Sequence, residues 1–135
     1  MKKKDKVIIA SVIIIIGIAA VISYFIFLYE PTYPLESDKL IGTWYNPGLG
    51  FGNWTLYFYS NGSGKEIQGS CSPEPLNDTF LWEISNEILC LDYTKKNTSG
   101  CMQGKFIGDY NHLELKVAES MPFEFKIKFK FEKID

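Results

Sequence analysis

One uncharged apolar run constrains this 135-residue chain more than any other feature. It extends from Val7 to Tyr29, and 12 of its 23 residues are Ile or Val. As an α-helix rising about 1.5 Å per residue, the run would be roughly 35 Å long, which exceeds the ~30 Å hydrocarbon core of a bilayer. We therefore expect a transmembrane helix at 7–29, and the remaining length allows one small domain.

A cleaved signal peptide is the rival interpretation of this run. Signal peptides usually have an apolar region of ~7–15 residues that ends at a small-x-small cleavage site. Gly17-Ile18-Ala19 fits that pattern, but ten largely apolar residues follow it and the run ends in bulky side chains. We expect an uncleaved signal anchor, with removal of the segment as the alternative.

Four lysines in the first six residues predict the orientation of the helix. Basic residues beside a first membrane span stay on the cytoplasmic side, so residues 1–6 form a cytoplasmic tail and the rest of the chain is extracytoplasmic. Pro31 and Pro34 disfavour helix at the residues before them, which predicts an extended linker at 30–37. The folded domain is then expected at 38–135.

The charge of the outer domain excludes one class of partner. From Glu30 onward the chain has ten Lys and fifteen acidic residues, a net charge of −5, while the tail before the helix carries +3. Nucleic-acid binding needs a concentrated basic face, which this mixed and acidic domain does not provide. All three Trp lie in the domain, and such an aromatic content is typical of a folded core rather than of disorder.

Alternation of apolar and polar residues predicts an all-β domain. Apolar residues alternate with Glu and Lys from Phe123 to Glu132 and again from Leu113 to Val117, as in strands with one buried face. Turn residues separate the apolar runs into eight strands, which suggests an antiparallel meander closed into a barrel, with a two-sheet sandwich as the alternative. The predicted strands cover 40–45, 54–60, 64–70, 78–85, 87–93, 101–107, 112–118 and 122–133.

The first predicted strand resembles a known family. Leu40-Ile41-Gly42-Thr43-Trp44 is similar to the Gly-x-Trp opening of the lipocalin-like barrels. The resemblance implies that Gly42 allows close chain approach and that Trp44 closes one end of the barrel. Members of the family pack an Arg over this Trp, and the present chain has no Arg; Lys130 or Lys133 from the last strand would take its place.

Residues 42–46 also resemble the opening of the avidin-like barrels. That resemblance implies that Asn46 contacts a ligand, but the later ligand-stacking Trp residues and the closing Asp of that class have no counterpart here. We therefore favour the resemblance to the lipocalin-like barrels over that to the avidin-like barrels.

The predicted function is ligand or partner binding without catalysis. An eight-stranded barrel is either filled by side chains or holds one small ligand. The Gly-rich strip 45–53 is expected to form a lid or, alternatively, a plain hairpin connection. The candidate ligand contacts are Asn46, Leu49, Phe51, Trp54 and Trp82. We expect a small apolar ligand or a cell-envelope protein as partner; the alternative is a filled barrel with a structural or interaction role.

Three cysteines outside the cytoplasm allow at most one internal disulfide. In a meander, the third strand ends and the sixth begins at the same end of the barrel, which predicts the pair Cys71 and Cys101 and leaves Cys90 alone. No Cys-x-x-Cys occurs and His112 is remote in sequence, so neither a metal nor another cofactor is expected.

Sequons and catalytic motifs complete the sequence evidence. Four Asn-x-Ser/Thr sequons are candidate glycosylation sites, at Asn53, Asn61, Asn77 and Asn97. The sequence has no nucleophile elbow or phosphate loop, and the lone His112 falls in a predicted turn. An enzyme is therefore not expected.

Overall fold

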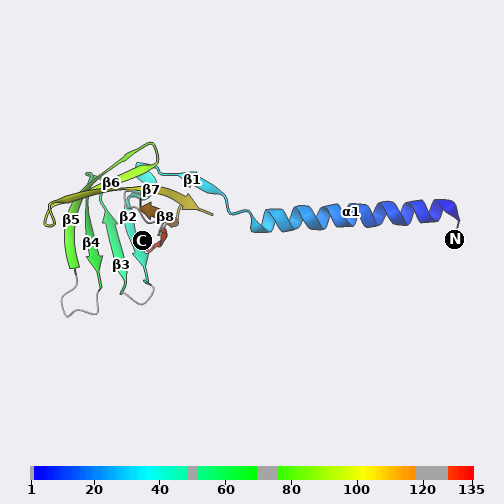
Figure 1. Cartoon of the computed structure of the whole chain (residues 1–135), viewed down its shortest axis with the longest axis horizontal. Coiled ribbons are helices and arrows are strands. Elements are labelled where there is room, and N and C mark those ends of the chain that lie inside the picture. Colours follow the sequence, from blue (N-terminus) through cyan, green and yellow to red (C-terminus); the bar gives the residue numbers. More distant parts are fainter. Residues whose placement is uncertain (1, 49–51, 70–75, 118–127) are drawn as a thin grey trace, which may run out of the picture. The chain divides into compact units, whose positions relative to one another are not determined.

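The computed structural model describes residues 2–48, 52–69, 76–117 and 128–135, and it falls into two compact units, Met1–Glu30 and Pro31–Asp135 (Figure 1). The first unit contains helix α1 (Lys3–Leu28). The described residues of the second form nine strands and a short helix. Each unit is described separately below.

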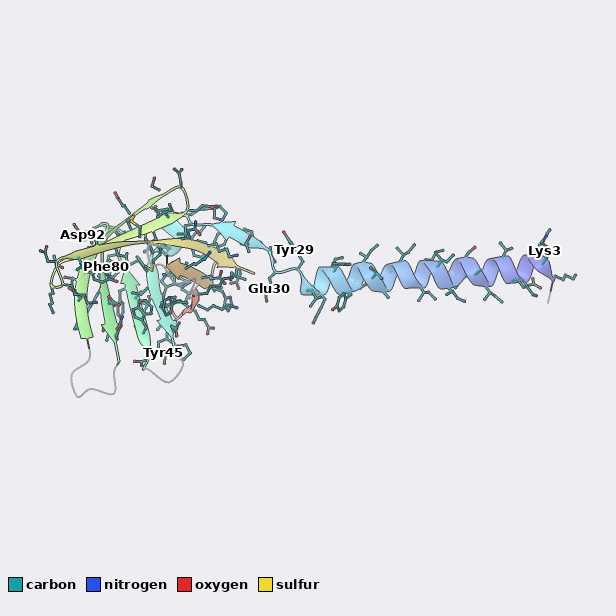
Figure 2. All side chains as sticks on the ribbon, viewed as in Figure 1. Lys3, Tyr29, Glu30, Tyr45, Phe80 and Asp92 are labelled. Atoms are coloured by element: carbon teal, nitrogen blue, oxygen red, sulfur yellow. A yellow bond between two sulfur atoms is a disulfide. The ribbon has the colours of Figure 1, made fainter. Side chains whose placement is uncertain are left out.

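Three polar side chains of helix α1 hydrogen-bond locally to the backbone. The Asp5 carboxylate accepts the backbone N–H of Lys2 at 3.0 Å, which caps the helix and places a negative charge in its first turn. The Ser11 and Ser23 hydroxyls donate to the carbonyls four residues earlier. Side chains radiate on all sides between Lys3 and Tyr29, and none in the helix is buried (Figure 2). Its length and apolar composition are sufficient to span a membrane.

The second unit is a closed eight-stranded antiparallel β-barrel, as the alternation predicted. The strands are β2 (Gly42–Asn46), β3 (Trp54–Phe58), β4 (Ser63–Gln68), β5 (Leu76–Ser85), β6 (Ile88–Tyr93), β7 (Thr98–Ile107), β8 (His112–Val117) and β9 (Lys128–Lys133). Each pairs with the next along the chain, and β9 returns to β2 through Trp44↔Lys133 and Tyr45↔Glu132. The up-and-down meander is therefore confirmed and the sandwich alternative is wrong.

The segment expected as a linker is partly built into the barrel. Strand β1 (Thr32–Pro34) pairs with β7 at Lys105–Ile107, beyond the last pairing of β6 with β7 at Gln103. Leu35 follows and is only 7% exposed, and helix α2 (Ser37–Leu40) comes next. Leu35 lies against Gly104, where a side-chain Cβ would be 2.5 Å from its Cδ1. Burial of the apolar Leu35 side chain therefore ties part of the expected linker to the barrel.

The core lies inside the barrel and follows the period-two pattern. Trp44 is fully buried, and its indole Nε1 donates to the Leu40 carbonyl at 2.8 Å. Phe131 is buried and Phe129 partly buried, as expected, while the earlier part of that predicted strand lies outside the described residues. The buried apolar residues are Leu35, Leu40, Trp44, Leu56, Phe58, Phe80, Leu89, Leu91, Phe106, Leu113, Leu115 and Phe131.

The disulfide joins Cys101 to Cys90, so the predicted Cys71–Cys101 pair is wrong. Cys90 and Cys101 are directly opposite each other on β6 and β7, with their Cα atoms 4.0 Å apart. The prediction began β7 at residue 101, whereas the strand begins at Thr98 and carries Cys101 into register with Cys90. Cys71 lies outside the described residues.

Candidate functional site

The two ends of the barrel interior differ in chemistry. We name the ends by what lies at them: the α2 end, where Trp44 packs against Phe106 at 5.8 Å between ring centroids, and the β6–β7 end, where the turn Thr94–Asn97 lies. The α2 end is apolar. The β6–β7 end places buried carboxylates beside aromatic rings.

Gly42 and Trp44 both lie at the α2 end, together with Lys133. The ammonium of Lys133 is 5.5 Å from the centroid of the Trp44 ring and donates to the Lys39 carbonyl at 3.3 Å. Gly42 has a φ of 137°, and a Cβ there would meet Lys133 Cε at 2.6 Å. Lys130, the other lysine considered for this position, is exposed on β9. The side chain of Asp135 accepts from the Thr43 backbone N–H at 2.7 Å, which joins the chain end to β2.

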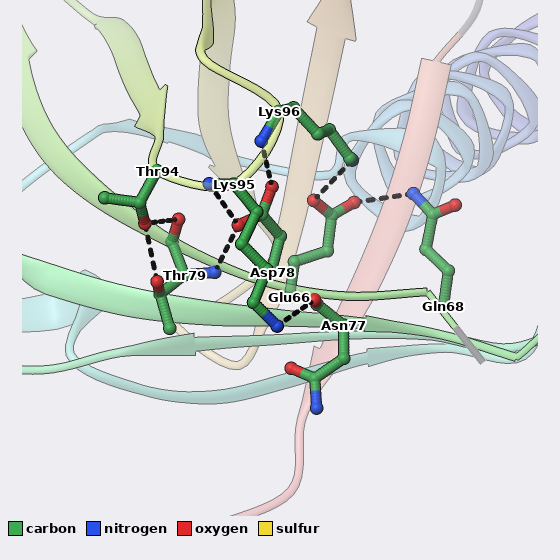
Figure 3. Close-up of polar contacts among 8 residues, drawn as sticks. All are labelled: Glu66, Gln68, Asn77, Asp78, Thr79, Thr94, Lys95 and Lys96. Atoms are coloured by element: carbon green, nitrogen blue, oxygen red, sulfur yellow. Dashed lines mark hydrogen bonds and ion pairs between the residues drawn. The ribbon is translucent and has the colours of Figure 1, made fainter. Parts of the chain in front are cut away.

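Two carboxylates face each other at the β6–β7 end (Figure 3). Glu66 on β4 is paired in register with Asp78 on β5, and each is 2% exposed. Two acidic groups side by side in a barrel interior would repel, so each needs its own compensating partners.

Asp78 obtains its partners from the backbone. Its carboxylate accepts the N–H groups of Thr79 at 2.8 Å, Lys95 at 3.0 Å and Lys96 at 3.2 Å. Burial raises the pKa of Asp78, but these three hydrogen bonds and the charge of Lys96 outweigh it and hold the pKa below its ordinary value. Asp78 therefore stays ionised and fixes the β6–β7 turn.

Glu66 obtains its partners from side chains. Its Oε1 accepts from Gln68 Nε2 at 2.5 Å, and Lys96 Nζ lies 3.5 Å from Oε2 as an ion pair. Burial, followed by the neighbouring Glu66 carboxylate, raises the pKa of the Tyr93 hydroxyl, which therefore remains protonated beside Glu66. Lys96 Nζ also lies 4.6 Å from the centroid of the Tyr93 ring. Oε2 of Glu66 is buried, and its charged partner is Lys96, while the Tyr93 hydroxyl hydrogen-bonds with the Glu66 carboxylate.

Trp54 has one incompletely satisfied group. Its ring packs edge-on against Phe129 at 4.9 Å and Phe131 at 5.1 Å. Its Nε1 is buried, and among the described residues no acceptor reaches it. By contrast, the indole N–H of Trp82 donates to the Ser63 carbonyl at 2.9 Å.

The other candidate residues lie at several positions of the barrel. Asn46 Oδ1 accepts the Gly48 N–H at 2.7 Å and so forms a local turn. Leu49 and Phe51 lie outside the described residues, and with them the centre of the expected lid. The sequon residues Asn53, Asn61, Asn77 and Asn97 are all exposed. Glu66, Asp78 and Lys96 were not among the sequence candidates; the signal for Glu66 was a polar residue at an inward position of β4.

One hollow of the barrel, of about 220 Å³, is lined by Glu66, Asn77, Asp78, Lys95 and Lys96 at the β6–β7 end. Another, of about 360 Å³, involves outward-facing residues of β7, β8 and β9, including Lys105, Glu114 and Lys128. Glu114 is 7% exposed there because the two lysines cover it, each with Nζ 3.8 Å from Oε1.

His112 belongs to neither hollow. Its Nδ1 is 2.8 Å from Asp109 Oδ1 in the exposed turn between β7 and β8. The hydrogen bond with His112 lowers the pKa of Asp109, with a further contribution from the Asn111 backbone N–H. In the ranges that the structure covers, no three His, Cys, Asp or Glu side chains gather as a metal site.

Comparison with known proteins gives no match: no family model, curated protein or solved structure is similar to this chain.

Proposed function

We propose that the chain is a membrane-anchored, extracytoplasmic, lipocalin-like domain that binds a small apolar or amphiphilic molecule without catalysis. The observation that carries the proposal is the asymmetry of the barrel interior. Leu40, Trp44 and Phe106 are fully buried at the α2 end, whereas the β6–β7 end has a hollow of about 220 Å³ beside the buried carboxylates of Glu66 and Asp78. Binding barrels are commonly closed at one end and take ligands at the other.

The lipocalin-like reading is supported by the arrangement around Trp44. A cation from the last strand lies over the ring of a Trp on the first barrel strand, and Gly42 gives that cation room. This is the role for which the family uses Arg. Lys133 fills it here with a point charge, because lysine has no planar group to stack on the indole.

The proposed location is supported by the tail, the helix and the disulfide. The four lysines before α1 favour a cytoplasmic N-terminus, which places the barrel outside. Disulfides persist in oxidising compartments, so the Cys90–Cys101 bond favours the same side. Protease added to intact cells should remove the barrel of the full chain and leave α1 protected; a barrel cleaved only after lysis would contradict this orientation.

The binding proposal is tested by native mass spectrometry of the full chain, produced in an oxidising secretory host and compared before and after organic extraction. We expect a co-purified small molecule that extraction removes. Glu66→Leu should abolish its retention because Leu removes the buried carboxylate. Glu83→Leu, the same change at an exposed position on the same sheet, should retain it and controls for lipid held by the helix.

A filled barrel with a protein partner is the second candidate. It is favoured by the extent of apolar packing and by the position of the larger hollow on the outer face. A bare protein mass for both the wild-type chain and Glu83→Leu would refute ligand binding and favour this candidate.

A further inference from the structure

The hollow of about 360 Å³, which we call the outer hollow, lies on the outer wall of the barrel beside the turn between β5 and β6. Asn86 and Glu87 form this turn with positive φ, and both line the hollow. The Glu87 carbonyl accepts the Gly104 N–H at 3.1 Å, which ties the turn to β7. Small-molecule pockets usually have volumes of about 300–1,000 Å³, so the outer hollow is large enough for a small ligand.

Glu114 brings two ammonium groups together at the outer hollow. Its side chain is almost completely buried, and the Nζ atoms of Lys105 and Lys128 are each 3.8 Å from its Oε1. The two Nζ atoms are therefore no more than twice that distance apart. At 3.8 Å these contacts are ion pairs and not hydrogen bonds, so the carboxylate does not occupy the N–H donors of either lysine. Both lysine side chains are about half exposed, at 45% and 53%, and can donate to a ligand.

The outer hollow has the opposite charge to the domain around it. Three lysines and two glutamates are among the described residues that line it, a net charge of +1, whereas the chain from Glu30 onward carries −5. The third lysine, Lys116, follows Glu114 by two residues on β8 and so shares its outward face. The local charge therefore favours an anionic ligand.

The type of cation favours phosphate over carboxylate. A carboxylate is best matched by the two parallel donors of arginine, and the sequence has no Arg. Lysine binds phosphate as a point charge, and a phosphate group offers at least three acceptor oxygens in a monoester. Three separate ammonium groups can therefore share one phosphate.

The remaining polar groups of the outer hollow suit a hydroxylated ligand. Asn86 and Gln103 supply amide groups that both donate and accept, and Glu87 supplies a carboxylate that accepts. A hydroxyl group can pair with each of them, whereas an apolar body would only displace water from them.

We infer that the outer hollow binds a small phosphorylated polyol. Its phosphate is held by the three lysines, and its hydroxyl groups are held by the polar side chains beside them, Asn86, Glu87 and Gln103. This site is separate from the barrel interior, so the inference does not depend on the ligand proposed there.

Calorimetric titration of the full chain in phosphatidylcholine nanodiscs tests the ligand class. The probes are glycerol 3-phosphate, inorganic phosphate, glycerate and glycerol, at one ionic strength because salt screens exposed charges. We expect glycerol 3-phosphate to bind at least fivefold more tightly than phosphate or glycerate, and glycerol to give no measurable binding. Glycerate that binds as tightly as glycerol 3-phosphate would overturn the choice of phosphate, and inorganic phosphate that does so would overturn the polyol.

Two lysines on β9 give a matched pair of variants. Lys128→Gln removes one ammonium group from the outer hollow and leaves Lys105 to pair with Glu114, so we expect glycerol 3-phosphate to bind about three- to tenfold more weakly. Lys130→Gln removes the same charge at the next outward position of β9. Lys130 is exposed and does not line the outer hollow, so binding should stay within twofold. Dispersed amide spectra establish that each variant is folded.

The possible results separate a specific site from general attraction by the surface. Equal losses in Lys128→Gln and Lys130→Gln would show that the charge of β9 attracts anions without a site, and would overturn the inference. A wild-type chain that does not bind glycerol 3-phosphate would also overturn it.

One further probe distinguishes two sources of the same chemistry. Glycerophosphoglycerol is the water-soluble diester head of a phosphatidylglycerol lipid. If it binds more tightly than glycerol 3-phosphate, the result supports a lipid headgroup as the ligand; if it binds more weakly, the result supports a soluble phosphate monoester.

Discussion

The ammonium group of Lys133 lies 5.5 Å from the centroid of the fully buried Trp44 ring and joins the last strand of the barrel to the first. The same group donates to the Lys39 carbonyl just before β2. In the described residues, β9 and β2 pair at two positions, and the Ile134 N–H adds a hydrogen bond to the Thr43 carbonyl, so side-chain contacts between these two strands matter for stability.

Lys133→Met tests the side-chain contact between β9 and β2. Methionine keeps the apolar stem of the side chain but removes the cation over Trp44 and the hydrogen bond to Lys39. We expect the free energy of unfolding to fall by about 1–2 kcal/mol, the sum of one cation–π contact and one hydrogen bond. Urea unfolding of the full chain in detergent measures the change. Lys130→Met, an exposed control on the same strand, should change it by less than about 0.5 kcal/mol; equal effects would contradict the Trp44 contact.

Alanine substitutions at Gly104 and Gly100 on β7 give a matched test of packing in the barrel. A Cβ at Gly104 would lie 2.5 Å from Leu35 Cδ1, whereas a Cβ at Gly100 meets nothing within 4 Å. Gly104→Ala should therefore overpack the core and destabilise the barrel by about 1–3 kcal/mol. Gly100→Ala should be neutral or slightly stabilising because alanine restricts the unfolded chain. Thermal unfolding followed by circular dichroism distinguishes them, and a tolerated Gly104→Ala would show that β1 and Leu35 do not pack on β7.

The Cys90–Cys101 bond predicts a specific peptide map. Non-reducing digestion should link the peptides that contain these two residues, and Cys71→Ser should leave the link intact. Because the bond spans a separation of 11 residues, Cys90→Ser with Cys101→Ser should lower the stability by about 2–3 kcal/mol on the chain-entropy account. A peptide map that links Cys71 to Cys101 would contradict this pairing.

Asp78 predicts how stability depends on pH. Its pKa is lower in the folded barrel than in the unfolded chain, so its contribution is fully present above the unfolded value of about 3.9 and is lost as the pH falls through the lower folded value. Asp78→Asn should destabilise the barrel at pH 7, and its difference from the wild type should shrink below about pH 4. Asp92→Asn, at an exposed position on β6, is the control. A difference that grows on acidification would show that Asp78 is not held as a carboxylate.

Much of the barrel could be predicted because strand alternation is a local property. Leu113 and Leu115 on β8, and Phe131 on β9, are buried where the period-two pattern placed them. The turn at Ser85-Asn86-Glu87 could also be predicted from local sequence. Asn86 and Glu87 both take positive φ, as a two-residue hairpin turn requires. The disulfide was missed because it depends on the register between β6 and β7, whereas the prediction paired Cys71 with Cys101 from the barrel end at which their strands end and begin.

The spacing of apolar residues along the chain was therefore enough to predict an apolar helix long enough to span a membrane and a domain of eight antiparallel strands. The tertiary structure was needed to show that Cys90 pairs with Cys101, that β1 and Leu35 belong to the barrel, and that Glu66 and Asp78 lie side by side inside it. Those relationships join residues from different strands, and the register that sets them is fixed by closure of the whole ring, which no local pattern encodes.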